Sequence, residues 1–316
     1  MVQLKARQAF VLALSTIVVV SMVSCSCFER SPLDTAGVHR ITPSGRTWSP
    51  VGGISWSPDG TRLAVTRTIG GVVDDPEGYI YTVDLKSQKS QIITHTQTGA
   101  GFTSLAWSPL SDRVAVSTTA WEPYGIWLVD LNGEQEPTYL GQGSSCAWAP
   151  DGERIAIADS LGESFSIYVL NSLTGERREV FQESTTGEYA TIGGISWSLR
   201  DDHLAFAFGW DDHDASTPDT MRLYELDLAS GESRLLAESG WIWSPSWSPD
   251  GTMIAYSTGN QVLEITLAII DVDEGSTVHP LNAYDVRLAA WSPYGSLIAF
   301  EWQGDVYVID TAFLGE

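Results

Sequence analysis

The sequence is poor in cysteine and in basic residues, and each shortage excludes a class of protein. Three cysteines are too few for a disulfide framework. Only 17 residues are basic against 40 acidic ones, which gives a formal net charge of −23. Nucleic acid is bound largely through Lys and Arg contacts to phosphate, so it is a poor partner for this chain. An anionic lipid surface is disfavoured for the same reason.

The sequence motifs of common catalytic and metal centres are also missing. The chain has no G-x-S-x-G elbow, no H-E-x-x-H and no paired C-x-x-C. Its five histidines are scattered among different segments. Carboxylates suit Ca²⁺, but the run Asp211-Asp212-His213-Asp214 lacks regular ligand spacing and is better explained as a solvated acidic loop. The sequence therefore predicts no metal site and no cofactor.

The first 24 residues are predicted to be a signal peptide rather than part of the fold. Lys5 and Arg7 precede an almost entirely apolar run over residues 9–23, which is short for a membrane span. The run ends in Met22-Val23-Ser24-Cys25, which resembles the bacterial lipobox, where a cysteine after a small residue becomes a lipidated N-terminus. We expect a signal peptide over 1–24, lipidation at Cys25, a tether over 25–37 and a folded domain over 38–316. Ordinary cleavage that releases a soluble exported protein is the first alternative, and a retained membrane anchor is the second.

A repeated pattern occupies the rest of the chain. Six segments share a tryptophan that follows Ser or Ala and precedes Ser-Pro-Asp-Gly or a variant of it, and they recur roughly every 40–50 residues. An apolar strand, a variable loop and a strand that ends in Asp or Asn follow each segment. The anchor tryptophans are Trp56, Trp107, Trp148, Trp197, Trp247 and Trp291. This period fits one four-stranded blade, so the sequence predicts an all-β, six-bladed β-propeller.

The residues of the repeated turn have a physical explanation. Proline fixes φ at one corner and Asp-Gly tolerates positive φ, so the hairpin is tight. The large, flat tryptophan before the turn is suited to packing between neighbouring blades. The fourth copy departs most, because residues 199–202 read Leu-Arg-Asp-Asp instead of Pro-Asp-Gly, which leaves the geometry of its turn open. Cys146 falls in a predicted strand, where a buried free thiol is expected.

The repeat resembles that of TolB-like propellers, whose units read W-S-P-D-G, then I-A-F, then I-Y-V-x-D. The resemblance covers about residues 38–310 in six copies that stay in phase. It implies partners in the cell envelope, which for this family include a peptidoglycan-associated lipoprotein.

The two ends of the repeat array are incomplete in complementary ways. The sixth copy lacks room for a fourth strand after Asp310, whereas residues 38–42 form a strand-like segment ahead of the first copy. We expect this N-terminal strand to complete the last blade, because such closure protects the sheet edges of the ring.

Several tryptophans that the repeat does not explain fall on one side of the predicted ring. That side carries the loops between second and third strands and the links between blades, and such variable loops often carry function. The candidate ligand-binding residues are Trp48, Trp121, Glu122, Trp210, Asp211, Trp241, Trp243, Arg287 and Trp302. The alternative is that these tryptophans only pack the loops against the blades.

Aromatic faces beside carboxylates suit sugars, cationic peptides or amines, and protein partners that use Trp as an anchor. The sequence favours an exported, lipid-anchored and monomeric propeller at the outer face of a membrane, which binds an envelope protein or glycan through this side. The alternative is a carbohydrate-active lyase or hydrolase that uses acids such as Glu122 or Asp211, since some such enzymes resemble this fold. No pair of acids has a spacing that identifies it as catalytic, so we expect a binding module and no catalytic residues.

Overall fold

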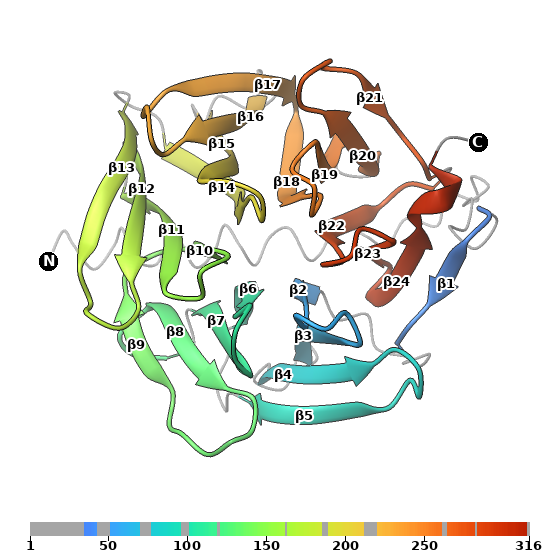
Figure 1. The fold of residues 1–316 in the computed structure, drawn as a ribbon, viewed down its shortest axis with the longest axis horizontal. Coiled ribbons are helices and arrows are strands. Elements are labelled where there is room, and N and C mark those ends of the chain that lie inside the picture. Colours follow the sequence, from blue (N-terminus) through green and yellow to red (C-terminus); the bar gives the residue numbers. More distant parts are fainter. Residues whose placement is uncertain are drawn as a thin grey trace, which may run out of the picture. The chain divides into compact units, whose positions relative to one another are not determined.

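Four-stranded antiparallel sheets form six blades around a common centre in the computed structural model (Figure 1). The structure describes residues 35–42, 51–69, 77–95, 101–118, 121–161, 163–184, 189–211, 220–260, 264–281 and 283–314. All of them belong to one unit over residues 31–316. The first strands of neighbouring blades contact one another at the centre, and the fourth strands lie at the rim. The predicted six-bladed, all-β propeller is confirmed.

Five of the blades follow the chain from centre to rim. Blade 1 contains β2 (Val51–Trp56), β3 (Arg62–Ile69), β4 (Glu77–Asp84) and β5 (Ser90–His95), and blade 2 contains β6 (Phe102–Trp107), β7 (Arg113–Thr118), β8 (Gly125–Asp130) and β9 (Thr138–Gly141). Blade 3 contains β10 (Ser145–Trp148), β11 (Arg154–Leu161), β12 (Ser164–Asn171) and β13 (Arg177–Ser184), and blade 4 contains β14 (Tyr189–Trp197), β15 (His203–Asp211), β16 (Thr220–Asp227) and β17 (Ser233–Ser239). Blade 5 contains β18 (Trp241–Trp247), β19 (Met253–Gly259), β20 (Thr266–Asp271) and β21 (Thr277–Val278).

Blade 6 is completed from the opposite end of the chain. It contains β22 (Val286–Trp291), β23 (Leu297–Trp302) and β24 (Asp305–Asp310), which a short 3₁₀ helix over Thr311–Phe313 follows. Its rim strand is β1 (Val38–Arg40), which pairs antiparallel with β24 so that Val38 lies opposite Ile309. The N–H of Ile41 extends this pairing by donating to the carbonyl of Val306 at 2.8 Å. The predicted closure by the N-terminal strand is confirmed.

The W-S-P-D-G turn is held by its own serine and aspartate. In blade 1, the buried Ser57 hydroxyl accepts the N–H of Arg62 at 2.9 Å and donates to Asp59 Oδ1 at 2.6 Å. Asp59 also accepts the N–H and the hydroxyl of Thr61. The bonds from Ser57 and Thr61 lower the pKa of Asp59 to about 2. Gly60 has a φ of +65°, which glycine adopts without steric cost. These motif residues therefore stabilise the turn itself.

Blade 4 forms the same hairpin without the Pro-Asp-Gly sequence. The N–H of Ser198 donates to the carbonyl of His203 at 2.9 Å, as the N–H of Ser57 does to Arg62 in blade 1. The Ser198 hydroxyl accepts the N–H of Arg200 at 3.3 Å. The geometry that the sequence left open is thus fixed by the same backbone hydrogen bond.

The anchor tryptophans lie between blades, as predicted. The guanidinium of Arg62 in blade 1 lies 4.9 Å from the centre of the Trp107 ring in blade 2, and Arg154 covers Trp197 at the same distance between blades 3 and 4. A serine before an anchor adds a link to the next blade, because its hydroxyl accepts the backbone N–H of the next anchor. Such bonds join Ser55 to Trp107, Ser196 to Trp247 and Ser246 to Trp291. The Ser-Trp pairs of the sequence therefore fasten one blade to the next.

The polar residue that ends each third strand caps the turn that follows it. In blade 4, Asp227 Oδ1 accepts the N–H groups of Ala229 and Ser230. Asn171 in blade 3 and Asp271 in blade 5 make the equivalent pair of bonds. The repeated acid or amide is therefore explained by the fold.

Some of the predictions fall on residues that the structure does not describe. Residues 1–34, which include the predicted signal peptide and Cys25, lie outside the described residues, and so does Trp48. Within the described ranges, no helix combines the length and apolar character needed to cross a membrane. Cys146 is free and buried, as predicted, and burial raises the pKa of its thiol to about 12.

Candidate functional site

The two faces of the ring carry different connections. Because neighbouring strands in each blade are antiparallel, the W-S-P-D-G turns and the turns between third and fourth strands lie on one face. We call this the turn face. The loops between second and third strands and the links from one blade to the next lie on the opposite face, the loop face.

Trp121 belongs to a row of aromatic rings at the loop face of blade 2. Its ring centre lies 5.5 Å from that of Phe102 in β6 and 5.2 Å from that of Trp127 in β8, in edge-to-face geometry. Trp127 lies 5.3 Å from Tyr139 in β9. Trp121 is half-buried, whereas Glu122 beside it is exposed. The row therefore crosses the blade from its first strand to its fourth.

Trp210 lies near the end of β15, at the loop face of blade 4, and contacts blade 3. Its ring meets Phe208 edge-on at 5.8 Å, and its Nε1 donates to Glu183 Oε1 of β13 at 3.3 Å. The next residue, Asp211, pairs with Tyr189 through the backbone, and its side chain lies outside the described part of the structure. Trp210 is therefore a half-buried link between two blades whose polar edge is bound to an acid.

Trp241 and Trp243 are brought together on β18 in blade 5. Their rings are stacked, with centres 6.1 Å apart and planes 17° apart. Both are half-buried and pack against the apolar core between blades 4 and 5.

Trp302 and Arg287 occupy neighbouring strands at the loop face of blade 6. Trp302 Nε1 donates to the carbonyl of Tyr284 at 3.0 Å, and its ring meets Tyr307 edge-on. Arg287 Nε lies 3.0 Å from Asp285 Oδ1, and its side chain is exposed. Tyr284 is 61% exposed, so this blade presents an aromatic ring and an ion pair together.

The candidate residues form local groups rather than one constellation. Trp121, Trp210 and Trp302 lie on blades 2, 4 and 6, and each packs against a different interface core. The described candidate tryptophans are all half-buried. Each ring is thus held by packing and keeps some contact with solvent.

A buried carboxyl that the sequence did not identify lies opposite Arg287 in the strand pairing. Glu301 is 5% exposed and accepts the N–H of Gly304. Burial raises its pKa to about 7, against the lowering effects of the Gly304 bond and of Arg287. The same position in the other second strands holds a small residue: Thr66, Ser117, Ala158, Ala207 and Ser257. When the six second strands are aligned with one another, a glutamate stands at a position that otherwise holds a small residue, and this is the sequence signal that points to the site.

Glu301 belongs to a group of ionisable residues between blades 6 and 1, which we call the closure seam. The group consists of Arg40, Arg67, Tyr81, Glu301 and Asp305. Arg40 of β1 forms an ion pair with Asp305 of β24, and Arg67 of β3 lies 3.9 Å from the same carboxylate. Burial raises the pKa of Tyr81, with Arg67 and Asp305 nearby. The strand that closes the ring is therefore fixed by charge as well as by sheet pairing.

A family model settles the relationship that the repeat suggested. Residues 48–295 match the TolB beta propeller domain, which is well over half of the chain. The chain belongs to the TolB beta-propeller family.

Solved structures of TolB and of an enzyme share the fold. TolB from Acinetobacter baumannii is 15% identical with a TM-score of 0.59, and the match covers 80% of this chain but 64% of that one, less than two thirds of its length. A putative TolB from Agrobacterium tumefaciens is 17% identical with a TM-score of 0.57, over 86% of this chain and 96% of that one. Hydrazine synthase from Kuenenia stuttgartiensis is 20% identical with a TM-score of 0.57, over 85% and 79%. At these identities the likeness shows the fold alone.

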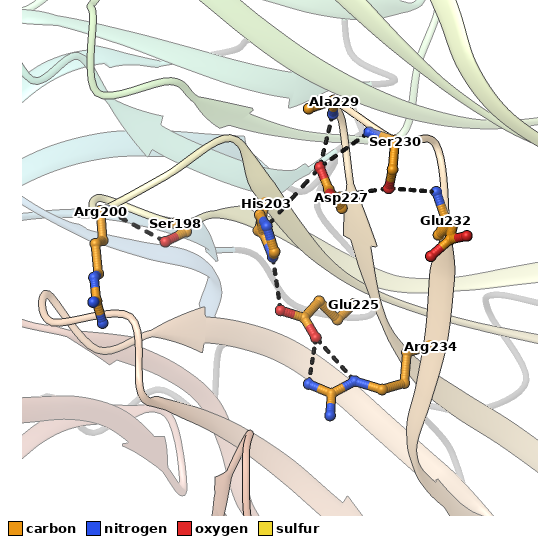
Figure 2. Close-up of polar contacts among 9 residues, drawn as sticks. All are labelled: Ser198, Arg200, His203, Glu225, Asp227, Ala229, Ser230, Glu232 and Arg234. Atoms are coloured by element: carbon orange, nitrogen blue, oxygen red, sulfur yellow. Dashed lines mark hydrogen bonds and ion pairs between the residues drawn. The ribbon is translucent and has the colours of Figure 1, made fainter.

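The blade that departs most from the TolB repeat carries a charged network at its turn face (Figure 2). His203, the first residue of β15, has its Nδ1 2.8 Å from Glu225 Oε1 of β16. Arg234 of β17 donates to the other oxygen of Glu225 through Nε and Nη2. Burial lowers the pKa of His203, but the Glu225 bond and nearby acids such as Asp227 raise it overall. The network ties three strands of blade 4 together.

The TolB fold brings no metal centre together in the part of the chain that the structure describes. Among those residues, no three His, Cys, Asp or Glu side chains form a group that could hold a metal ion.

Proposed function

We propose that this TolB-family propeller is an exported, lipid-anchored module that binds a protein of the cell envelope through its loop face. The observation that carries the proposal is the set of half-buried tryptophans on this face, on three alternate blades: Trp121, Trp210 and Trp302. Aromatic side chains that are held by packing and still reach solvent are typical anchors for protein partners. The middle residues of the second strands, such as Phe206 and Val65, are by contrast fully buried in the interface cores.

Exposed polar and aromatic groups next to these anchors support the same face. Glu122 and Tyr124 are exposed beside Trp121, and Tyr284 and Arg287 are exposed beside Trp302. A central aromatic anchor with a polar surround is the usual composition of a protein interface. An envelope glycan is the other ligand that fits, because sugars stack on Trp faces and hydrogen-bond to acids.

A lipid at Cys25 and a binding site on the loop face are compatible with one orientation of the propeller relative to the membrane. The carbonyl of Gly37 accepts the N–H of Asp310 at the end of β24, which lies on the turn face. The chain thus enters the ring from the turn face. A lipid at Cys25 would be joined to Gly37 by a segment that spans at most about 40 Å. The turn face would then point toward the membrane and leave the loop face free for a partner.

A carbohydrate-active enzyme is the second candidate, and Glu301 is the observation that favours it. A carboxyl with a pKa raised to about 7 has the protonation behaviour of a general acid or base. Its 5% exposure limits access by a substrate, so we place this candidate second. Hydrolysis or lyase activity on envelope polysaccharides that is lost in Glu301→Gln, with the fold retained, would reverse this order.

Site-specific photo-crosslinking in intact cells tests the binding face. A benzophenone amino acid replaces Tyr124 or Tyr284 on the loop face, which are 56% and 61% exposed, or Tyr294 on the turn face, which is 73% exposed. We expect a discrete partner protein to crosslink from positions 124 and 284, with little product from the matched control at 294. Equal or stronger crosslinking from position 294 would contradict the proposal.

The lipid anchor needs a separate test. Cys25→Ala should move the protein from the membrane fraction to the soluble fraction and abolish incorporation of a labelled fatty acid. The matched variant Cys27→Ala should change neither, and membrane retention of Cys25→Ala would argue against the anchor.

A further inference from the structure

A row of four aromatic rings lies at the loop face of blade 2. It consists of Phe102, Trp121, Trp127 and Tyr139, and neighbouring ring centres are 5.5, 5.2 and 5.3 Å apart. Phe102 is buried, and the other three rings are half-buried. The row is thus anchored in the core at its inner end and reaches solvent toward the rim.

The polar edges of two of these rings are already engaged by the adjacent loop. Trp127 Nε1 donates to the carbonyl of Pro123 at 3.1 Å, and the Tyr139 hydroxyl donates to the carbonyl of Tyr124 at 3.2 Å. Both bonds hold the rings in place before any ligand arrives. A ligand therefore meets mainly ring surface, which recognises a cation through the ring quadrupole and offers few hydrogen-bond donors to a sugar.

The charge around the row also favours a cation. Glu122 is exposed next to Trp121, and at the outer end of the row the charges of Arg177 and Asp159 act on Tyr139 with opposite signs. The formal net charge of the whole chain is −23, so the surrounding field attracts positive groups.

Elsewhere in the propeller, arginine side chains of this protein lie over aromatic rings. Arg62 lies over Trp107, Arg154 over Trp197, and Arg177 over Tyr168 at 3.8 Å. In the described part of the molecule, no arginine or lysine is placed over a ring of the blade 2 row in this way. The row therefore has the composition of these internal sites without an internal cation.

We propose that the aromatic row of blade 2 binds a positively charged side chain of an extended partner polypeptide, a lysine, a methylated lysine or an arginine. This rests on the proposed function of the loop face and names the chemistry of the partner there. Ring surface supplies the contact with the cation, and Glu122 supplies charge pairing at its edge.

Fluorine NMR on the exported chain labelled with 5-fluorotryptophan tests the proposal. The probe is N-acetyl-trimethyllysine methylamide, and its control is the neutral analogue in which carbon replaces the quaternary nitrogen. Physiological salt screens the general attraction of an acidic protein for cations. We expect the cationic probe to shift the Trp121 and Trp127 resonances in a saturable way, and the neutral analogue to leave them unchanged.

Variants assign the effect to the row. Trp121→Leu should weaken binding, read at Trp127, about fivefold or more. Tyr294→Leu on the turn face of blade 6, where Tyr294 is 73% exposed, is the matched control and should bind like the unaltered chain. If Trp121→Leu does not fold, Trp121→Phe keeps the packing and should still weaken binding, because Phe is a poorer partner for a cation than Trp.

Equal binding of the neutral analogue, undiminished binding in the Trp121 variants, or an equal loss in Tyr294→Leu would each overturn the proposal. Crosslinking from Tyr284 and Tyr124 that persists while the cationic probe fails to bind would reject this inference and leave the binding face intact. Loss of loop-face crosslinking while the probe still binds would reject the proposed function instead.

Discussion

The interface between blades 3 and 4 and the interface between blades 6 and 1 hold the same ring together with different chemistry. Between blades 3 and 4, Phe165 of β12 stacks on Phe208 of β15 with ring centres 4.4 Å apart and planes 7° apart. Phe206 stacks on the same pair. Between blades 6 and 1, the closure seam adds two arginines and two carboxyls to an apolar core, and the two carboxyls, Glu301 and Asp305, lie on the same hairpin.

The difference shows at which blade interface the stability of the propeller should depend on pH. Burial of aromatic rings stabilises a fold through apolar area and ring geometry, and neither changes with pH. Buried charges need partners and titrate, so they make stability depend on pH. The seam also joins segments that lie at opposite ends of the domain sequence, whereas blades 3 and 4 are consecutive. Ion pairs also join consecutive blades, as Arg154 of blade 3 does with Asp202 of blade 4, but their side chains are more exposed than those of the seam. The more buried charge pairing therefore lies where the chain must find its most distant partner.

Deletion of the closing strand, β1, should destabilise the propeller more than any single substitution at either interface. Deletion of residues 38–43 removes the rim strand of blade 6 and leaves Asp305 without Arg40. We expect loss of the cooperative unfolding transition in thermal denaturation followed by circular dichroism. An unchanged transition would show that the seam does not hold the ring closed.

A cavity in the aromatic interface should have the next largest effect. Phe206→Ala removes a fully buried ring and should lower the free energy of unfolding by about 3–5 kcal/mol. Denaturant titration at several pH values checks both the size of the loss and its independence from pH. Phe206→Leu is the matched control and should lose less, and a loss under about 1 kcal/mol in Phe206→Ala would contradict close packing there.

Neutralising the buried acid of the seam should raise stability at high pH. The pKa of Glu301 is about 7 in the folded chain against an ordinary value of 4.5, so the folded form binds an extra proton between these values. The free energy of unfolding contributed by this group therefore falls as pH rises through that window. Glu301→Gln should be more stable than the unaltered chain at pH 8 by about 3 kcal/mol, and similar to it near pH 4.

The control for that experiment is Asp305→Asn in the same seam. It removes the partner of Arg40 and Arg67 and should destabilise the chain near pH 7. Both variants keep His203, so its titration cancels when each is compared with the unaltered chain. A parallel pH dependence in Glu301→Gln and the unaltered chain would contradict the raised pKa.

A single hydrogen bond between ordinary blades gives the smallest expected effect. Ser55→Ala removes the acceptor of the Trp107 N–H between blades 1 and 2 and should cost about 1 kcal/mol. Ser246→Ala, which makes the equivalent bond to Trp291, should cost a similar amount. A loss as large as that of Phe206→Ala would mean that the serine links, rather than the rings, dominate the interfaces.

The repeat allowed the fold to be predicted because each blade is encoded locally. Turn residues, strand lengths and strand-ending acids recur in the sequence, and even the closure by residues 38–42 followed from one strand missing and one left over. The tryptophans could be placed on the loop face because each follows or precedes a predicted strand. Their half-burial could not be predicted, since it depends on neighbours such as Glu183 and Tyr284 that the fold supplies.

The contacts between ionisable residues could not be predicted from the sequence for a different reason. Arg67 and Asp305 are far apart in the sequence and meet only when the ring closes. His203 and Glu225 lie closer in the sequence, but their contact depends on the register between β15 and β16. Register and closure are tertiary facts, so a sequence pattern that describes one blade at a time does not contain them.

Two triple variants that alter the same three blades test the binding face most directly. Trp121→Ala, Trp210→Ala and Trp302→Ala change the loop face, whereas Leu110→Ala, Leu199→Ala and Tyr294→Ala change exposed side chains on the turn face of blades 2, 4 and 6. The measurement is the affinity of each folded variant for the crosslinked partner, by calorimetry. We predict a loss of at least about tenfold for the loop-face variant and an unchanged affinity for the turn-face variant. Full affinity in the loop-face variant, or an equal loss in both, would contradict the assignment of binding to the loop face.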